Sequence, residues 1–405
     1  MRLLIADKLH SRAIEELRSL PIEVVYEPEV TAETLEKLIA HVGILVVRST
    51  EVTAATIDAA RQLHLIVRAG ASFGTIDVRA ASQRGIYVAN CPGKNAAAVA
   101  ELVMGLILAL DRRIPDAVAS MRSGRWERSE FSNAEGLYGK TIGILGLGAV
   151  GREVAQRARS FGLHVIAFSR GLSVARAADL GFGHATSVED LASRSQIVTV
   201  HLALVERTRQ IVHRGIIDLL PDRALFVNTA RADLVDYDAL RDAVRDRGLR
   251  AAVDVFPNEP KGRRDVSTEV FETSPTGGIL YGTPHIASAT DQAQRAIASE
   301  TVRVIRSFLF QGDVPNVVNV SPASSARFQV VVRMIDKLGT FAHVLSVFKR
   351  HGIRVEEVTN TVFDGANASC AKLRVVSRPS EACLAEIRAF EEVIHVETVS
   401  LPSLA

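Results

Sequence analysis

The sequence predicts an α/β protein with two doubly wound parallel sheets in series and a small α+β domain at the end of the chain. Three observations carry this prediction. Short apolar runs alternate with helical periods over residues 1–90, a glycine-rich turn follows a further apolar run near residue 145, and the order changes to βαββαβ after residue 327. Strands that alternate with helices are typical of parallel sheets with helices on both faces.

Length and composition limit the class of protein. A chain of 405 residues exceeds the size at which one core keeps growing, so two or three domains are expected. The contents of 47% hydrophobic and 23% charged residues are those of an ordinary globular protein, and a net charge of +2 argues against a dedicated nucleic-acid surface. Three cysteines without metal-ligand spacing predict a reducing compartment and no metal site.

The most apolar run is expected to be a buried helix. Residues 96–110 are interrupted by Glu101 and are too few to cross a bilayer. The N-terminal apolar run ends at Asp7, too early for a signal peptide. The expectation is therefore a cytoplasmic protein with no membrane segment.

The predicted strands fall into three groups. The first sheet is expected from the runs 3–6, 24–26, 44–47, 65–67 and 86–88. The second sheet is expected from 142–145, 165–168, 197–202, 225–228, 251–255 and a run ending near residue 284. Two α/β sheets in series favour a ligand cleft between them. The third group, 328–333, 353–362, 368–376 and 393–400, alternates with helices at 340–351 and 380–391 in a βαββαβ order.

The strand at 142–145 runs into the turn Gly146-x-Gly148-x-x-Gly151, and an amphipathic helix follows. In a dinucleotide-binding turn the first glycine permits the tight bend, the second lets a pyrophosphate approach the backbone, and the third lets helix pack on strand. The strand before and the helix after give the motif its required context. We predict a nicotinamide dinucleotide on the backbone of residues 146 and 148–151, that is Gly146, Gly148, Ala149, Val150 and Gly151.

The second strand of this unit ends in Ser169-Arg170, where an acidic residue usually binds the adenine ribose. A hydroxyl followed by a guanidinium suits a 2′-phosphate, through charge-assisted hydrogen bonds. The sequence therefore predicts a preference for NADP over NAD. The alternative is that Ser169 replaces the acid without consequence and Arg170 faces solvent.

Three residues suited to hydroxy-acid chemistry follow strands of the second sheet. Arg231 follows the strand at 225–228, Glu259 follows the strand at 251–255, and His285 lies in Thr283-Pro284-His285-Ile286. Oxidising a 2-hydroxy acid needs a base for the hydroxyl proton, a carboxylate that orients the imidazole, and a cation that fixes the substrate carboxylate. We expect His285, Glu259 and Arg231 to serve in these roles.

These motifs together resemble the D-isomer-specific 2-hydroxyacid dehydrogenase family, over nearly the whole chain. The resemblance implies a discontinuous substrate domain (1–93 and 287–316) and a dinucleotide-binding Rossmann domain (94–286). It implies that Arg231, Glu259 and His285 are catalytic and that Asp254 lies near the nicotinamide. Further cofactor contacts are expected from His201, Thr208, Thr229 and Ala230.

Within the family the chain most resembles the members that act on phosphoglycerate. That likeness implies a place for a phosphate at the ends of the third and fourth strands of the first sheet. Two guanidiniums and a backbone turn are expected to converge there, from Arg48, Ser49, Arg68, Ala69 and Gly70. The alternative is that Arg48 and Arg68 hold only the substrate carboxylate or a neighbouring acid.

The segment 327–405 resembles an ACT domain, a class of small domain that commonly binds amino acids and assembles subunits. An effector is expected near Asp336, Gly339 and Arg354; the alternative is a role in assembly alone. Family resemblance also suggests a homodimer or homotetramer.

The leading hypothesis is an NAD(P)-dependent dehydrogenase that interconverts 3-phosphoglycerate and 3-phosphohydroxypyruvate in serine biosynthesis. An NADPH-dependent reductase of glyoxylate or hydroxypyruvate is the close alternative, favoured by Ser169-Arg170. A third hypothesis is a nucleotide-sensing protein without turnover, against which the set of Arg231, Glu259 and His285 argues.

Overall fold

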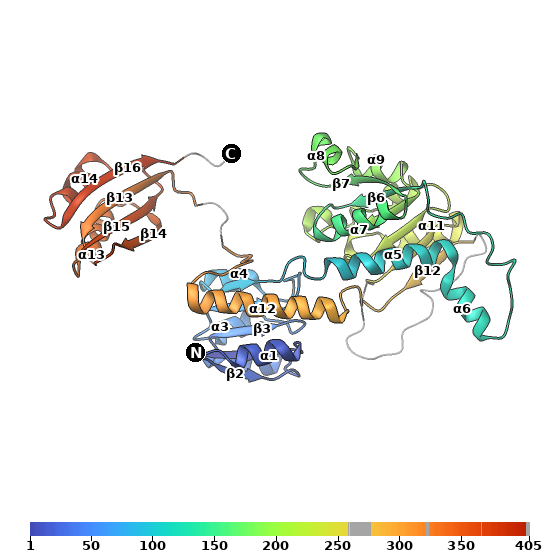
Figure 1. Cartoon of the computed structure of the whole chain (residues 1–405), viewed down its shortest axis with the longest axis horizontal. Coiled ribbons are helices and arrows are strands. Elements are labelled where there is room, and N and C mark those ends of the chain that lie inside the picture. Colours follow the sequence, from blue (N-terminus) through green and yellow to red (C-terminus); the bar gives the residue numbers. More distant parts are fainter. Residues whose placement is uncertain (258, 260–276, 321–323, 366, 402–405) are drawn as a thin grey trace. The chain divides into compact units, whose positions relative to one another are not determined.

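The computed structural model describes residues 1–257, 259, 277–320, 324–365 and 367–401. The chain divides into two compact units, Met1–Asn319 and Val320–Ala405 (Figure 1), and each is described by itself. The first unit contains two parallel sheets, and the second contains one antiparallel sheet. The predicted fold class is confirmed.

The first sheet has five parallel strands in the order β2-β1-β3-β4-β5. They are β1 (Arg2–Ile5), β2 (Glu23–Tyr26), β3 (Ile44–Val47), β4 (Leu65–Arg68) and β5 (Tyr87–Ala89). The strand order reverses between β1 and β3. In open parallel sheets, ligands bind outside the carboxyl ends of strands at such a reversal, so the loops after β1 and β3 are the places to look for a site.

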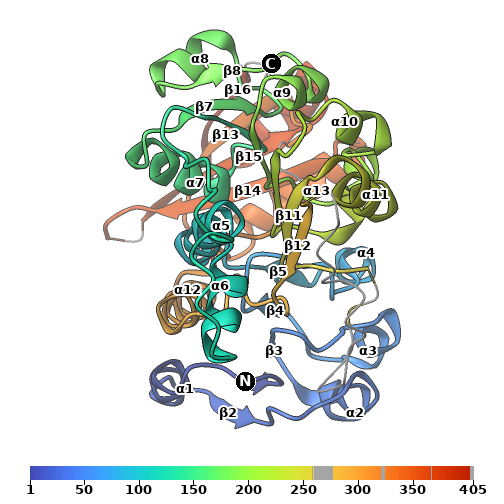
Figure 2. The same cartoon turned by 90° about the vertical axis from the view of Figure 1, so that its right-hand side faces the viewer.

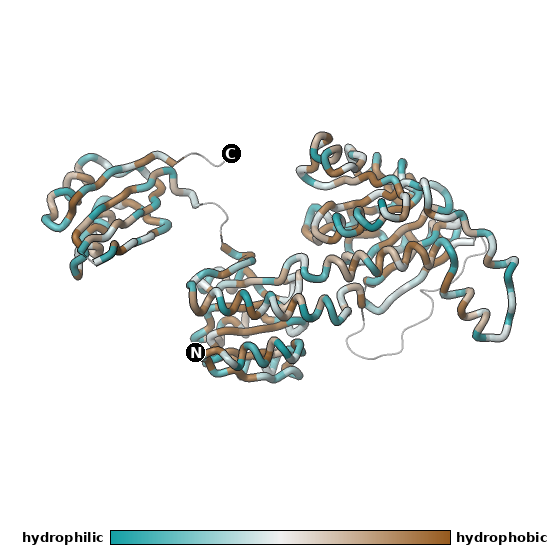
Figure 3. Tube along the Cα trace, in the orientation of Figure 1, coloured by the Kyte–Doolittle hydropathy of each residue, from teal (hydrophilic) through white to brown (hydrophobic). Residues whose placement is uncertain are grey.

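Helices cover both faces of the first sheet (Figure 2). One face packs against α1 (Ser11–Arg18) and α12 (Asp291–Gln311), and the other against α2 (Ala32–Leu38), α3 (Ala54–Ala59) and α4 (Val78–Gln83). Alternate residues of β1 point to opposite faces, so Leu3 and Ile5 join the first core and Leu4 the second. Because helices bury both faces, the central strands are largely apolar, and all four residues of β3 are buried (Figure 3). Residues 291–317 thus share a core with residues 3–91.

The second sheet has seven parallel strands in the order β12-β11-β10-β9-β6-β7-β8. They are β6 (Thr141–Leu145), β7 (His164–Phe168), β8 (Gly183–His184), β9 (Ile197–Val200), β10 (Leu225–Asn228), β11 (Arg250–Val253) and β12 (Ile279–Gly282). The order reverses between β6 and β9. The glycine turn after β6 therefore lies at the point where such sheets bind dinucleotides.

Helices also cover both faces of the second sheet. Figure 2 shows α5 (Ala96–Arg112) and α7 (Ala149–Ser160) on one face and α10 (Arg214–Asp218) and α11 (Tyr237–Arg247) on the other. The apolar run 96–110 is a buried helix, as predicted. The remaining elements in the described residues of the first unit are α6 (Ile114–Arg122), α8 (Val174–Asp179), α9 (Val188–Ser193) and three short 3-10 turns (Ile39–His41, Glu206–Thr208 and Ala232–Leu234).

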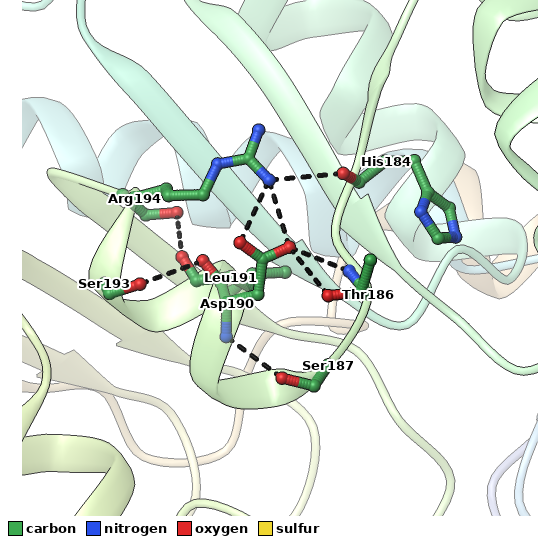
Figure 4. A network of polar contacts seen from close by, with 8 residues as sticks. His184, Thr186, Ser187, Asp190, Leu191, Ser193 and Arg194 are labelled. Atoms are coloured by element: carbon green, nitrogen blue, oxygen red, sulfur yellow. Dashed lines mark hydrogen bonds and ion pairs between the residues drawn. The ribbon is translucent and has the colours of Figure 1, made fainter.

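The start of α9 shows how polar side chains fix a helix beside the sheet (Figure 4). The Ser187 hydroxyl accepts a hydrogen bond from the Asp190 N–H (3.1 Å), and the Asp190 carboxylate accepts from the Thr186 N–H (2.8 Å) and from Arg194 (3.0 Å). The Thr186 N–H and the Arg194 guanidinium lower the pKa of Asp190. These bonds satisfy N–H groups that have no partner within the helix.

The second unit is a four-stranded antiparallel sheet in the order β14-β15-β13-β16. Its elements are β13 (Phe328–Ile335), α13 (Thr340–Arg350), β14 (Val355–Val362), β15 (Ala368–Val375), α14 (Glu381–Arg388) and β16 (Val393–Ser400). Both helices pack into one core with the sheet. The βαββαβ order matches the prediction and fits an ACT-like domain.

No helix among the described residues is both long and apolar enough to cross a membrane.

Candidate active site

The glycine turn after β6 is shaped to receive an anion. Gly146 has a φ of +102°, which a side chain rarely permits, and a Cβ on Gly151 would lie 2.1 Å from the Gly146 carbonyl oxygen. A Cβ on Gly148 would meet no atom within 4 Å, so open space lies beside the backbone there. Helix α7 begins at this point without a side-chain cap, and its first N–H groups have no partner within the helix. These residues fit a dinucleotide pyrophosphate.

His201 follows β9, on the other side of the strand reversal. A Cβ on Gly146 would lie 2.8 Å from the His201 backbone, so the two loops are in contact. The His201 ring nitrogen Nε2 lies 2.9 Å from the Thr199 hydroxyl, and burial lowers the pKa of the imidazole to about 3. His201 is therefore a neutral hydrogen-bonding group beside the cofactor turn.

Three further residues were predicted to contact the cofactor, and their side chains have different surroundings. The Thr208 hydroxyl donates to the Ala203 carbonyl (2.7 Å) and accepts from the Val205 N–H (2.8 Å), so it shapes its own loop. After β7, Ser169 is half-buried and Arg170 is exposed. Nothing in the described chain is shown to hydrogen-bond or pair with the Arg170 guanidinium, which leaves it free to meet a ligand.

The loop after β10 is held by Asn228, which is fully buried. Its carboxamide accepts a hydrogen bond from the Ala230 N–H (3.0 Å) and donates one to the Arg231 carbonyl (3.0 Å). The Arg231 guanidinium donates to the Ala230 carbonyl (2.6 Å). The hydroxyl of Thr229 is buried with no hydrogen-bond partner among the described residues, so it is a donor still to be satisfied.

Glu259 and His285 form the predicted pair. Glu259 Oε2 lies 2.7 Å from His285 Nδ1, and Glu259 Oε1 accepts from the Phe256 N–H (3.0 Å). With Nδ1 bound to the carboxylate, Nε2 of a neutral ring is the nitrogen left to accept a proton. The backbone of His285 has a φ of 52°, a conformation that a non-glycine residue adopts at a cost and that clusters at functional sites.

Asp254 fixes the loop that carries His285. The carboxylate is fully buried and accepts three hydrogen bonds, from the Thr283 hydroxyl (2.6 Å), the Ile286 N–H (2.8 Å) and the Ala287 N–H (2.8 Å). All three donors flank His285. In this structure Asp254 thus supports the loop that carries His285, and its predicted contact with a nicotinamide stays a prediction.

Three guanidiniums gather near the end of β4. Arg68 is mostly buried, its Nε has no hydrogen-bond partner in the described part of the chain, and its pKa is lowered by burial and then by Arg231 and Arg48. Gly70 makes room for it, because a Cβ at that position would lie 1.6 Å from the Arg68 side chain. Two further cations beside the largely buried Arg68 guanidinium make this a place where an anion would be stabilised.

The backbone beside these arginines is already paired. One oxygen of Asp7 accepts from the N–H groups of Arg48 (2.7 Å), Ser49 (3.0 Å) and Thr50 (3.0 Å). The N–H groups of Ala69 and Gly70 donate to the carbonyls of Val47 (2.7 Å) and Arg68 (2.8 Å). The backbone turn expected to bind phosphate therefore offers no free N–H at these five positions, and the guanidiniums are the available donors.

The structure does not bring the three predicted effector residues together within the second unit. Asp336 and Gly339 precede α13, whereas Arg354 follows it. A helix of 11 residues separates them, about 16 Å of axial rise. An effector near these three residues stays a prediction. No group of three or more metal-ligating side chains occurs among the described residues.

Sequence reasoning missed several supporting residues: Asp7, Asn228, Tyr237 and Thr283. Asn228 ends β10, Thr283 directly follows β12, and Asp7 comes two residues after β1; this place at the carboxyl edge of a sheet is a signal that could have found them. Tyr237 carried no such signal, because it lies at the start of α11 and its partner is a loop carbonyl.

Known proteins are similar to this chain over most of its length. Residues 104–287 match the model of the D-isomer specific 2-hydroxyacid dehydrogenase NAD-binding domain. The chain is 35% identical over 362 residues to a D-3-phosphoglycerate dehydrogenase of Methanocaldococcus jannaschii, covering 88% of this chain and 67% of that protein. It is 39% identical over 286 residues to a hydroxypyruvate reductase of Thermotoga maritima, covering 69% of this chain and 90% of that protein.

A solved structure shows the same fold. It is an NADPH-dependent glyoxylate/hydroxypyruvate reductase from Sinorhizobium meliloti in complex with NADP and malonate, with a TM-score of 0.66 and 26% identity over 78% of this chain and 96% of that one. Other D-3-phosphoglycerate dehydrogenases are longer than the part that this chain matches. The match covers 63% of the protein of Mycobacterium tuberculosis and 64% of that of Archaeoglobus fulgidus.

Proposed function

Because the chain belongs to the D-isomer-specific 2-hydroxyacid dehydrogenase family, we propose that it is a nicotinamide-dependent dehydrogenase that interconverts 3-phosphoglycerate and 3-phosphohydroxypyruvate. The observation that carries the choice of substrate is the cluster of Arg48, Arg68 and Arg231. A keto acid with a carboxylate and a phosphate presents charge to all three guanidiniums, whereas glyoxylate presents one carboxylate.

The residues around His285 account for the proton transfer. In the oxidising direction, His285 Nε2 takes the proton of the substrate hydroxyl, and Glu259 stabilises the imidazolium that results. Arg231 holds the substrate carboxylate in a fixed orientation. A bound nicotinamide would supply the acceptor for the hydride, which leaves the carbon that bears this hydroxyl. In the reducing direction the imidazolium returns the proton to the forming alkoxide.

Substrate identity is tested by measuring kcat/KM for 3-phosphohydroxypyruvate, hydroxypyruvate and glyoxylate, with the reaction followed by the absorbance of the reduced nicotinamide. Each charge-assisted hydrogen bond to the phosphate contributes about 1.5–3 kcal/mol, so two of them predict a preference in kcat/KM of about a hundredfold or more for the phosphorylated acid. Equal or higher kcat/KM with the unphosphorylated acids would contradict the assignment.

That contrary result would favour a second candidate, an NADPH-dependent reductase of glyoxylate or hydroxypyruvate. Two observations support this candidate. Ser169 and Arg170 follow β7, where such domains usually contact the adenine ribose. One relative is named a hydroxypyruvate reductase, and two solved neighbours are named glyoxylate or glyoxylate/hydroxypyruvate reductases.

For either substrate we propose that NADP is the preferred cofactor. The exposed guanidinium of Arg170 is available for a 2′-phosphate, and no carboxylate stands at the end of β7 to repel one. The variant Arg170→Asp is expected to lower kcat/KM with NADPH at least tenfold and to raise it with NADH. A wild-type protein that prefers NADH would contradict the proposal.

The second unit is proposed to assemble subunits in a cytoplasmic homodimer or homotetramer, with an amino-acid effector as the further possibility to test. Helices α13 and α14 cover one face of its sheet, and exposed apolar side chains such as Val358 and Val362 lie on β14. Light scattering of the full chain and of residues 1–319 tests assembly. Calorimetric titration with serine and other amino acids tests for an effector, and no heat with any of them would leave the assembly role alone.

A further inference from the structure

We propose that Tyr237 is a positioning residue for the Glu259–His285 pair, acting through the peptide unit that joins Val255 to Phe256. The inference rests on the proposed function, because it assumes that this pair moves the substrate proton.

Tyr237 is anchored at the first position of α11. Asp236 caps this helix, and its side chain accepts a hydrogen bond from the Ala239 N–H (3.0 Å). From this fixed helix end the Tyr237 hydroxyl donates to the carbonyl oxygen of Val255, a residue that is 1% exposed. Within the described chain no other donor is shown for that carbonyl, so the tyrosine satisfies a buried polar group that water does not reach.

The two ends of one planar group connect Tyr237 to the acid. The Val255 carbonyl and the Phe256 N–H belong to the same peptide unit, which is rigid. Its N–H donates to Glu259 Oε1 (3.0 Å), and Glu259 Oε2 binds His285 Nδ1 (2.7 Å). A rotation of this plane would therefore turn the donor away from Glu259. Tyr237 fixes the plane at one end, and the carboxylate is held at the other.

The phenol is suited to donate and to remain protonated. Burial raises the pKa of Tyr237, and the nearby carboxylates of Glu259 and Asp254 raise it further. The hydroxyl therefore keeps its proton at neutral pH and remains a donor to the Val255 carbonyl. Its effect on the reaction is through the geometry of the loop.

Removing only the hydroxyl tests the proposal. In Tyr237→Phe we expect kcat to fall about tenfold, as a base displaced by a fraction of an ångström loses efficiency, with KM for the keto acid and the Kd of the cofactor changed by less than about twofold. The matched control is Tyr281→Phe. That tyrosine is also partly buried, in β12, but the charged groups beside its hydroxyl are Asp116 and Arg113.

A double-mutant cycle with Glu259→Gln separates positioning from a general loss of stability. If Tyr237 acts through Glu259, the double variant Tyr237→Phe/Glu259→Gln has the same kcat as Glu259→Gln alone, within about twofold. Independent effects would instead multiply, and that result would overturn the inference, as would a normal kcat in Tyr237→Phe. Should Tyr237→Phe not fold, Tyr237→Met, which also lacks the hydroxyl, enters the same cycle.

The outcomes distinguish the inference from the proposed function. A wild-type protein without turnover on any of the three keto acids overturns the proposed function and the inference together. An active wild-type protein whose cycle is multiplicative overturns the inference alone.

Discussion

Replacing Asp254 with asparagine turns one acceptor oxygen of a buried carboxylate into a donor. Oδ1 of Asp254 accepts from Thr283 and Ile286, and Oδ2 accepts from the Ala287 N–H. The carboxamide of Asp254→Asn is most stable with its oxygen toward the two donors Thr283 and Ile286. Its NH₂ group then faces the Ala287 N–H. One charge-assisted hydrogen bond is then lost and one buried N–H has no partner, a cost of about 3 kcal/mol.

This cost has two measurable consequences. At about 2 °C per kcal/mol for a large unit, Tm is expected to fall by about 6 °C in a thermal unfolding experiment. Because all three donors flank His285, kcat is expected to fall about a hundredfold by nicotinamide absorbance. The control is Asp246→Asn, an exposed carboxylate paired with Arg245 at the end of α11. If the Tm and kcat of the two variants were equal, Asp254 would not be the support that we describe.

Three further predictions test the site. Gly151→Ala is expected to lower Tm, because the added Cβ would lie 2.1 Å from a backbone oxygen. Gly148→Ala, whose Cβ would meet no protein atom within 4 Å, is expected to fold normally and to bind the cofactor more weakly in a fluorescence titration. Equal Tm values for the two variants would contradict this prediction. Burial lowers the pKa of His201 to about 3 in the folded protein, whereas the unfolded chain has a pKa near 6.5, so the free energy of unfolding is expected to fall as the pH drops from 6.5 towards 3. Denaturant titrations should show a loss of about 2 kcal/mol at pH 5. His201→Gln should lose less over the same range, and an identical loss in the variant would contradict the prediction. Arg68→Met is expected to raise KM for 3-phosphohydroxypyruvate at least tenfold and to change KM for glyoxylate little. The surface control Arg84→Met should leave both KM values unchanged. A normal KM for 3-phosphohydroxypyruvate in Arg68→Met would exclude Arg68 from the substrate site.

Most of the fold followed from local patterns. Apolar runs of three to six residues between helical periods predicted ten of the parallel strands, most of which are buried. The prediction of a last strand near residue 284 corresponds to β12. The strand β8 was missed because two residues, Gly183 and His184, carry no periodic signal.

Two of the candidate catalytic residues could be predicted because they follow strands of the second sheet. Glu259 and His285 were expected as a pair and lie 2.7 Å apart. What the sequence did not reveal are relations between loops, such as the Tyr237 hydroxyl on the Val255 carbonyl and the Asp7 carboxylate on the N–H groups after β3. Such contacts depend on where distant segments meet, and no spacing along the chain encodes them.

The most direct test of the account is the turnover of His285→Ala with 3-phosphohydroxypyruvate and NADPH, measured together with the Kd of the cofactor. Removing a general acid and base that Glu259 orients predicts a loss of about a thousandfold in kcat, with cofactor binding unchanged. A variant that retained wild-type turnover would show that the proton is moved by another group and would contradict the central claim.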